Sequence, residues 1–258
     1  MGHRDRLDGH SPSRIHQGIQ GAEVRRPELV PHRFDHLHRD HGVVAAFDVA
    51  VVAQFDLDPI ADSGRRDALA GQAPLFNALS FALPPGVSWL GGDEGAGKTT
   101  LLRLLAGELR PLSGTVQIDA PVFWVNPRDD GGDALTPRQC FDRMAGPHTA
   151  FNRAMLDALL PALDLSPHLD KRLDMLSTGS RRKVWLAAAF ASGAALTLLD
   201  QPFAAVDKAS MRVMIEWLNG AAQAGRAVVV ADYEPPPGVA LSGAIDLDAP
   251  CVQPGTLT

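Results

Sequence analysis

The chain has 258 residues, 45% of them hydrophobic, so it is long enough to bury a full core, and we expect one domain with two lobes. Its formal net charge of −6 argues against a nucleic-acid partner, because such proteins usually carry a basic stripe. Cys140 and Cys251 have neither disulfide-framework nor metal-site spacing, and no apolar run reaches the roughly eighteen residues of a membrane span. We therefore expect a protein of a reducing cytosol.

The first seventy residues differ in composition from the rest. Seven of the nine histidines lie there, between His3 and His41, among Arg, Asp and Pro. A metal cluster of His32, His36, His38 and His41 is one interpretation, but flexible histidines without a folded scaffold make poor specific sites. We assign residues 1–70 to an N-terminal extension, either disordered or translated from a frame extended upstream of the true start. The run 43–52 has strand-like character and could supply an edge strand.

The domain proper is expected over 71–258 and opens with strands. Residues 74–83 alternate in polarity and end at a Pro-Pro-Gly turn, and the apolar run 87–90 predicts a second strand. The pattern Gly-x-x-x-x-Gly-Lys-Thr follows from Gly92 to Thr99, and residues 100–107 have helical spacing with a glycine stop.

This glycine-rich loop predicts a site for nucleotide phosphates. Its glycines let successive backbone N–H groups point inward, Lys98 adds a positive charge, and the Thr99 hydroxyl can hold Mg²⁺. The predicted nucleotide-binding residues of the loop are Gly92, Asp93, Glu94, Gly95, Ala96, Gly97, Lys98, Thr99 and Thr100.

Further along the chain, apolar runs alternate with polar, proline-punctuated segments. Residues 122–125 read as a strand, and 127–175 as a polar segment that is helical near 151–163. Leu-Ser-Thr-Gly-Ser at 176–180 precedes a helical stretch, and the strand 195–199 ends in Asp200. Residues 226–230 contain three consecutive valines and fit a late buried strand, and 244–247 fit a last short one.

The order of these motifs resembles that of the ATP-binding cassette (ABC) family. The loop at 92–99 is followed by a signature-like string at 176–180, a Walker B-like Asp200 and a D-loop-like segment at 204–207. The resemblance runs from about residue 72 to the C-terminus. It implies an α/β P-loop fold with a mainly parallel sheet, an antiparallel β edge and a short inserted helical lobe at about 127–185. Such a short lobe resembles that of compact cassettes, among them the haem-exporter ATPase of cytochrome c maturation.

The resemblance also implies how the site works. Two cassettes would sandwich ATP, with the loop of one facing Ser177 and Gly179 of the other, while Thr99 and Asp200 hold Mg²⁺. The implied partners are a second cassette, in a homo- or heterodimer, and a separate transmembrane permease. The implied location is the inner face of the cell membrane. The simpler interpretations are that Ser177 only caps a helix and that Asp200 is a solvated strand-end carboxylate.

Several positions depart from the family pattern. Gln201 replaces the glutamate that polarises the attacking water, and Tyr233 replaces the switch histidine. General-base help is typically worth ~10²–10⁴ in rate, so we expect slow hydrolysis of ATP. Asp93 and Glu94 replace the usual proline and asparagine of the loop.

Two further family features are missing. The Q-loop glutamine is absent, with Asn126 or Pro127 nearest in register. No aromatic residue stands at the usual adenine position, where Phe76 is nearest and is better explained as core.

Three classes of function therefore remain open. The chain could be the ATP-binding subunit of a transporter, or a non-hydrolysing nucleotide module that regulates or forms the degenerate half of a heterodimer. The third class, a non-transport cassette acting on ribosomes or DNA, usually has two cassettes or long insertions and a less acidic charge. The transported substrate cannot be deduced, because specificity would lie in the permease.

Overall fold

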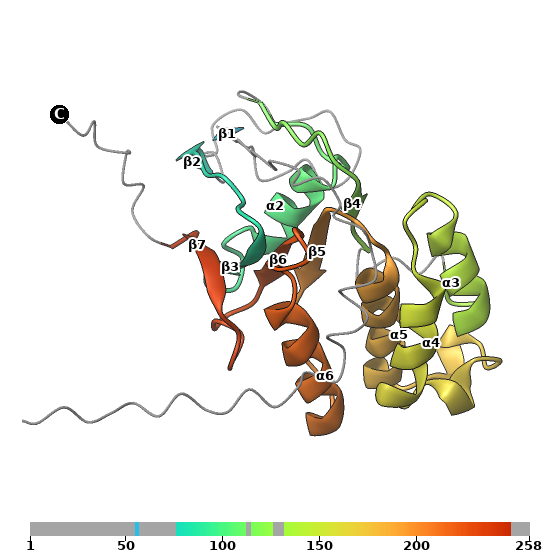
Figure 1. The fold of residues 1–258 in the computed structure, drawn as a ribbon. Coiled ribbons are helices and arrows are strands. Elements are labelled where there is room, and N and C mark those ends of the chain that lie inside the picture. The colour runs from blue at the N-terminus through green and yellow to red at the C-terminus, as the bar shows by residue number, and fades with distance from the viewer. Residues whose placement is uncertain (1–54, 57–75, 112–114, 126–131, 249–258) are drawn as a thin grey trace, which may run out of the picture. The chain divides into compact units, whose positions relative to one another are not determined.

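The computed structural model describes residues 55–56, 76–111, 115–125 and 132–248 (Figure 1). Its elements are the strands β1 (Phe55–Asp56), β2 (Asn77–Leu79), β3 (Gly86–Gly91), β4 (Val122–Phe123), β5 (Leu196–Asp200), β6 (Ala227–Ala231) and β7 (Leu241–Asp246), and the α-helices α2 (Lys98–Leu105), α3 (Pro137–Ala145), α4 (Arg153–Ala162), α5 (Thr178–Ala191) and α6 (Lys208–Asn219). Two 3₁₀ turns, Ser166–His168 and Leu173–Met175, lie between α4 and α5.

A five-stranded parallel sheet in the order β4-β5-β6-β3-β7 forms the centre of the fold. The expected parallel α/β fold is thus confirmed, while the antiparallel component is a separate pair, β1 with β2. β1 lies inside the segment assigned to the N-terminal extension, so at least Phe55 and Asp56 pair with the domain. The proposed strand 43–52 and the histidine cluster 32–41 lie outside the described residues.

The valine-rich strand β6 shows how the sheet separates two layers of core. Val228 and Val230 face the cluster that contains α5, α6 and the helical lobe, whereas Val229 packs against α2 on the opposite face. Successive side chains of a strand point to opposite faces, so a strand covered on both sides is apolar throughout. All five residues of β6 are buried, which agrees with a strand that is covered on both faces.

The inserted lobe consists of α3, α4 and the two 3₁₀ turns, and it packs on α5 (Figure 1). Its helices begin at side-chain caps: Thr136 accepts the N–H of Gln139 in a capping box, and Asn152 accepts the N–H of Met155. The helical stretch expected near 151–163 is therefore α4. No helix within the described ranges combines the length and apolar character that a bilayer span requires.

Arg226, immediately before β6, joins three elements from a half-buried position. Its guanidinium donates to the carbonyls of Ala189 and Phe190 at 3.2 and 3.1 Å, and its Nε donates to Ala194 at 3.0 Å. The group also lies 4.8 Å from the ring centroid of Trp217 on α6, and burial lowers its pKa to about 10. Arg226 thereby fixes the C-terminal end of α5, the helix whose N-terminus carries the signature-like residues.

Replacing Arg226 by lysine should lower the free energy of unfolding by about 3 kcal/mol, because a single ammonium cannot satisfy the buried carbonyls that the planar guanidinium reaches. Denaturant unfolding measures this change. Arg138→Lys is the matched control, since Arg138 and its partner Asp170 are 60% and 83% exposed, and its effect should stay within about 0.5 kcal/mol. Equal effects of the two variants would contradict the role given to Arg226.

Candidate functional site

The loop between β3 and α2 has the backbone that a phosphate cradle requires. Gly92, Gly95 and Gly97 have φ values of 144°, 84° and 100°, in the region that side chains rarely adopt. Gly97 is the N-cap of α2, where no side chain caps the helix and no acidic residue lies in the first turn. The N-terminus of α2, including Thr99 and Thr100, is therefore suited to an anion, because its N–H groups and dipole favour negative charge.

Lys98 and Thr99 lie at the start of α2 and point to the edge where the strands end. The Lys98 ammonium donates to the loop carbonyls of Gly92 and Asp93 at 2.5 and 2.9 Å, and only 7% of Lys98 is exposed. The Thr99 hydroxyl donates to Oδ2 of Asp200 at 2.6 Å. A hydroxyl and a carboxylate held together are hard oxygen donors, so this pair fits Mg²⁺ coordination, directly or through water.

The register of the sheet explains why Asp200 meets the loop. β5 pairs with β6 and β6 with β3, all parallel, so their carboxyl ends lie along one edge. Asp200 is opposite Ala231 of β6, and Gln201 donates its N–H to the Ala231 carbonyl at 2.8 Å. The sequence-predicted residues of the loop and of Walker B are therefore brought together.

Tyr233, at the switch-histidine position, also lies at this edge. Tyr233 is 51% exposed, and the Lys98 ammonium lies 4.2 Å from the centroid of its ring. This is cation–π distance. The contact places the ring of Tyr233 beside Lys98 of the phosphate loop.

Gln201 has an unusual backbone that a neighbouring arginine supports. Its φ is 46°, in the left-handed region that costs a residue with a side chain about 1 kcal/mol. Arg182 of α5 donates to the carbonyls of Gln201 and Ala204 at 2.8 and 2.6 Å. Burial lowers the pKa of Arg182, and the charges of Asp200 and Asp232 oppose that shift.

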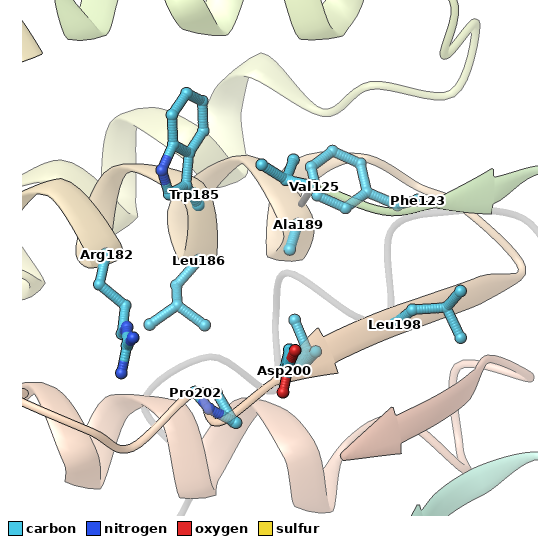
Figure 2. Close-up of a pocket in the computed structure, with 10 residues that line it drawn as sticks. Phe123, Val125, Arg182, Trp185, Leu186, Ala189, Leu198, Asp200 and Pro202 are labelled. Atoms are coloured by element: carbon cyan, nitrogen blue, oxygen red, sulfur yellow. The ribbon is translucent and has the colours of Figure 1, made fainter. Parts of the chain in front are cut away.

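A pocket of about 50 Å³ opens beside Asp200 and Arg182, which reach it from β5 and α5 (Figure 2). Its wall includes Phe123, Val125 and Trp185. Asn126 and Pro127, the nearest equivalents of the Q-loop glutamine, lie outside the described residues.

The signature-like residues stand at the N-terminus of α5. Ser177 is exposed and caps the helix, with its hydroxyl accepting the N–H of Ser180 at 3.1 Å. At Gly179, a side chain would place its Cβ 2.3 Å from the Ala205 carbonyl oxygen, so only glycine allows this approach of α5 to the loop 201–207. Within this chain, neither Ser177 nor Gly179 joins the phosphate loop.

The structure also describes Phe76, Asp93 and Glu94, which the sequence analysis singled out. Phe76 is 5% exposed and belongs to the core around α2, as expected. Asp93 and Glu94 are exposed, and the Asp93 N–H donates to Oδ2 of Asp248 at 2.5 Å.

Sequence reasoning missed three groups at the site. One is Arg182, and another is the ion pair between Lys183 and Asp207 at 3.1 Å. Asp207 also caps α6, and the Ser210 N–H that it accepts is the main cause of its lowered pKa. The third is Asp232, which directly follows β6. Its place directly after a buried strand was the available signal, much as the place of Asp200 at the end of β5 was.

Comparison with known proteins identifies the family. The model of the ABC transporter family matches residues 76–204. The chain belongs to the ABC transporter family. The cytochrome c biogenesis ATP-binding export protein CcmA of Sphingopyxis alaskensis is 32% identical over 166 residues, which are 64% of this chain and 85% of that protein. The cobalt import ATP-binding protein CbiO of Rhodobacter capsulatus is 31% identical over 200 residues, 70% and 71% of the two chains.

Solved structures support the same fold. A Pyrococcus furiosus chain described as an ABC transporter ATP-binding protein superposes with a TM-score of 0.60 at 19% identity, covering 76% of this chain and 96% of its own. The chain spans most of the length of these two relatives, CcmA and CbiO, which are named as ATP-binding proteins. The expected membership of the ABC family is thus confirmed, and cytochrome c biogenesis export proteins are among the relatives.

Proposed function

We propose that the chain binds Mg²⁺-ATP at the carboxyl edge of its sheet and couples it to a separate transmembrane permease. The observation that carries the proposal is the arrangement of Lys98, Thr99 and Asp200 at the uncapped N-terminus of α2. The loop N–H groups and Lys98 would hold the phosphates, while Thr99 and Asp200 would hold the metal. Docking on the permease would place the subunit at the inner face of the cell membrane.

Hydrolysis is the weakened step in this proposal. Gln201 can position water but cannot accept a proton, and Tyr233 presents its ring to Lys98 rather than an imidazole. A subunit of this kind holds nucleotide for long periods. The alternative that shares these features is a regulatory module, or the degenerate half of a heterodimer, in which the site binds ATP without hydrolysing it.

The proposal includes completion of the site by a second cassette. Two features support this part of the proposal: Ser177 is exposed at the N-terminus of α5, and Gly179 lies in the same turn, where the helix end favours an anion. Within this chain, Lys183 and Asp207 tie α5 to the loop 201–207. An ion pair therefore joins the helix that carries Ser177 and Gly179 to the segment after Walker B.

Lys98→Ala should weaken Mg²⁺-ATP binding at least tenfold, because hydrogen bonds to a charged group contribute about 1.5–3 kcal/mol. Isothermal titration calorimetry measures the affinity. Lys171→Ala, which removes the same charge from the exposed lobe, is the control and should bind like the wild type. Equal affinities of wild type and Lys98→Ala would refute the proposed function.

Ser177→Ala should leave the ATP affinity of isolated chains unchanged but lower turnover per chain about tenfold at concentrations where chains associate. Thr136→Ala removes the N-cap of α3 in the same way and is the matched control. Each variant should lose about 1 kcal/mol of stability. Sedimentation with ATP and steady-state turnover are the readouts. If both variants keep wild-type turnover, Ser177 is only a helix cap.

A further inference from the structure

The segment that follows Asp200 holds two residues in a backbone conformation that side chains rarely adopt. Gln201 and Ala205 have φ values of 46° and 58°, both in the left-handed region. A residue with a Cβ is strained there, and such strain persists only where the surrounding structure holds it. Strained residues gather at functional sites, so the contacts that hold Gln201 in place bear on what this site does.

The backbone of Gln201 is fixed through both of its peptide groups. Its N–H donates to the carbonyl of Ala231 on β6 at 2.8 Å, and its carbonyl accepts the N–H of Ala204 at 3.2 Å. Nη1 of Arg182 donates to this same carbonyl at 2.8 Å and to the carbonyl of Ala204 at 2.6 Å. Hydrogen bonds from a charged donor are stronger than those between neutral groups. Arg182 therefore supplies the charge-assisted contact that holds the strained residue.

Arg182 belongs to the site as well as to this loop. Arg182 and Asp200 line the same pocket, one from α5 and the other from the end of β5 (Figure 2). Oδ2 of Asp200 accepts the hydroxyl of Thr99 at 2.6 Å, which connects it to the phosphate loop. The bonds of Arg182 therefore support the residue that comes directly after the carboxylate facing the phosphate loop.

We propose that Arg182 is a positioning residue for ATP hydrolysis: it holds the Gln201 backbone so that the amide side chain stays where it orients the attacking water. This inference rests on the proposed function. In this role Arg182 touches neither nucleotide nor water and acts through the two peptide carbonyls. Because Nη1 alone makes both bonds, an ammonium at this position replaces part of the support. Arg182 governs the chemical step, whereas nucleotide binding depends on Lys98 and the phosphate loop.

Varying position 201 on the full chain separates positioning from stability. Arg182→Gln should lower kcat for Mg²⁺-ATP about tenfold in the wild-type chain and in a Gln201→Glu chain, with KM within about twofold, because a misplaced group loses rate rather than binding. In a Gln201→Gly chain it should cost less than about twofold, since glycine adopts this φ without strain and has no side chain to position. Arg182→Lys should lose less than Arg182→Gln. Arg226→Lys is the matched control, because Arg226 donates to carbonyls at the other end of α5, and it should keep wild-type kcat.

An equal loss of kcat in all three chains would overturn the proposal, because Arg182 would then act independently of the side chain at 201. Unchanged kcat, a loss confined to KM, or the same loss in Arg226→Lys would overturn it as well. So would turnover of the Gln201→Glu chain no higher than that of Lys98→Ala. If Arg182→Gln does not fold, Arg182→Lys replaces it in the three chains, with a smaller loss expected in the same pattern. Failure of the wild type to bind Mg²⁺-ATP in calorimetry is a different result, because it refutes the proposed function itself.

Discussion

The parallel pairing of β3, β6 and β5 is the constraint on which the rest of the site depends. Because the three strands run in the same direction and in register, their carboxyl ends deliver the phosphate loop, Asp232 and Asp200 to one edge. The hydrogen bond from Thr99 to Asp200 closes this arrangement across the sheet, and α2 gains its anion-binding end from the same geometry. A register slip of one residue would turn Asp200 into the core and Leu199 to the loop.

In the function that we propose, the site keeps the residues that bind phosphate and alters those that move a proton. Lys98, Thr99 and the loop glycines have the geometry that a phosphate cradle requires, whereas Gln201 and Tyr233 lack the carboxylate and the imidazole of the family pattern. Arg182 nevertheless holds the Gln201 backbone through two carbonyls, and Gly179 approaches the same loop closely. The loop after Walker B thus remains ordered by α5, which is what a site that binds and holds nucleotide requires.

Local pattern was enough to predict the phosphate loop, α2, α5, β5 and β6, because each is specified by a contiguous string with its own caps or burial. The expected strand 74–83 shortened to Asn77–Leu79 within the described residues, since alternation alone does not show where pairing ends. The roles of Arg182 and Arg226 depend on carbonyls far away in sequence, and the place of Asp232 at the site depends on which strands are neighbours in the sheet. Side chains of this kind can be assigned only when the topology is known.

The central claim is that nucleotide binding is retained while hydrolysis is weakened by Gln201 and Tyr233. Steady-state turnover of the full chain beside the Gln201→Glu, Tyr233→His double variant tests it most directly, with ATP affinity measured on both. The account predicts similar affinities and turnover that is at least tenfold higher in the double variant, since a proton acceptor and an imidazole return to the γ-phosphate. Turnover of several per second in the unmodified chain, abolished by Lys98→Ala and not raised in the double variant, would contradict it.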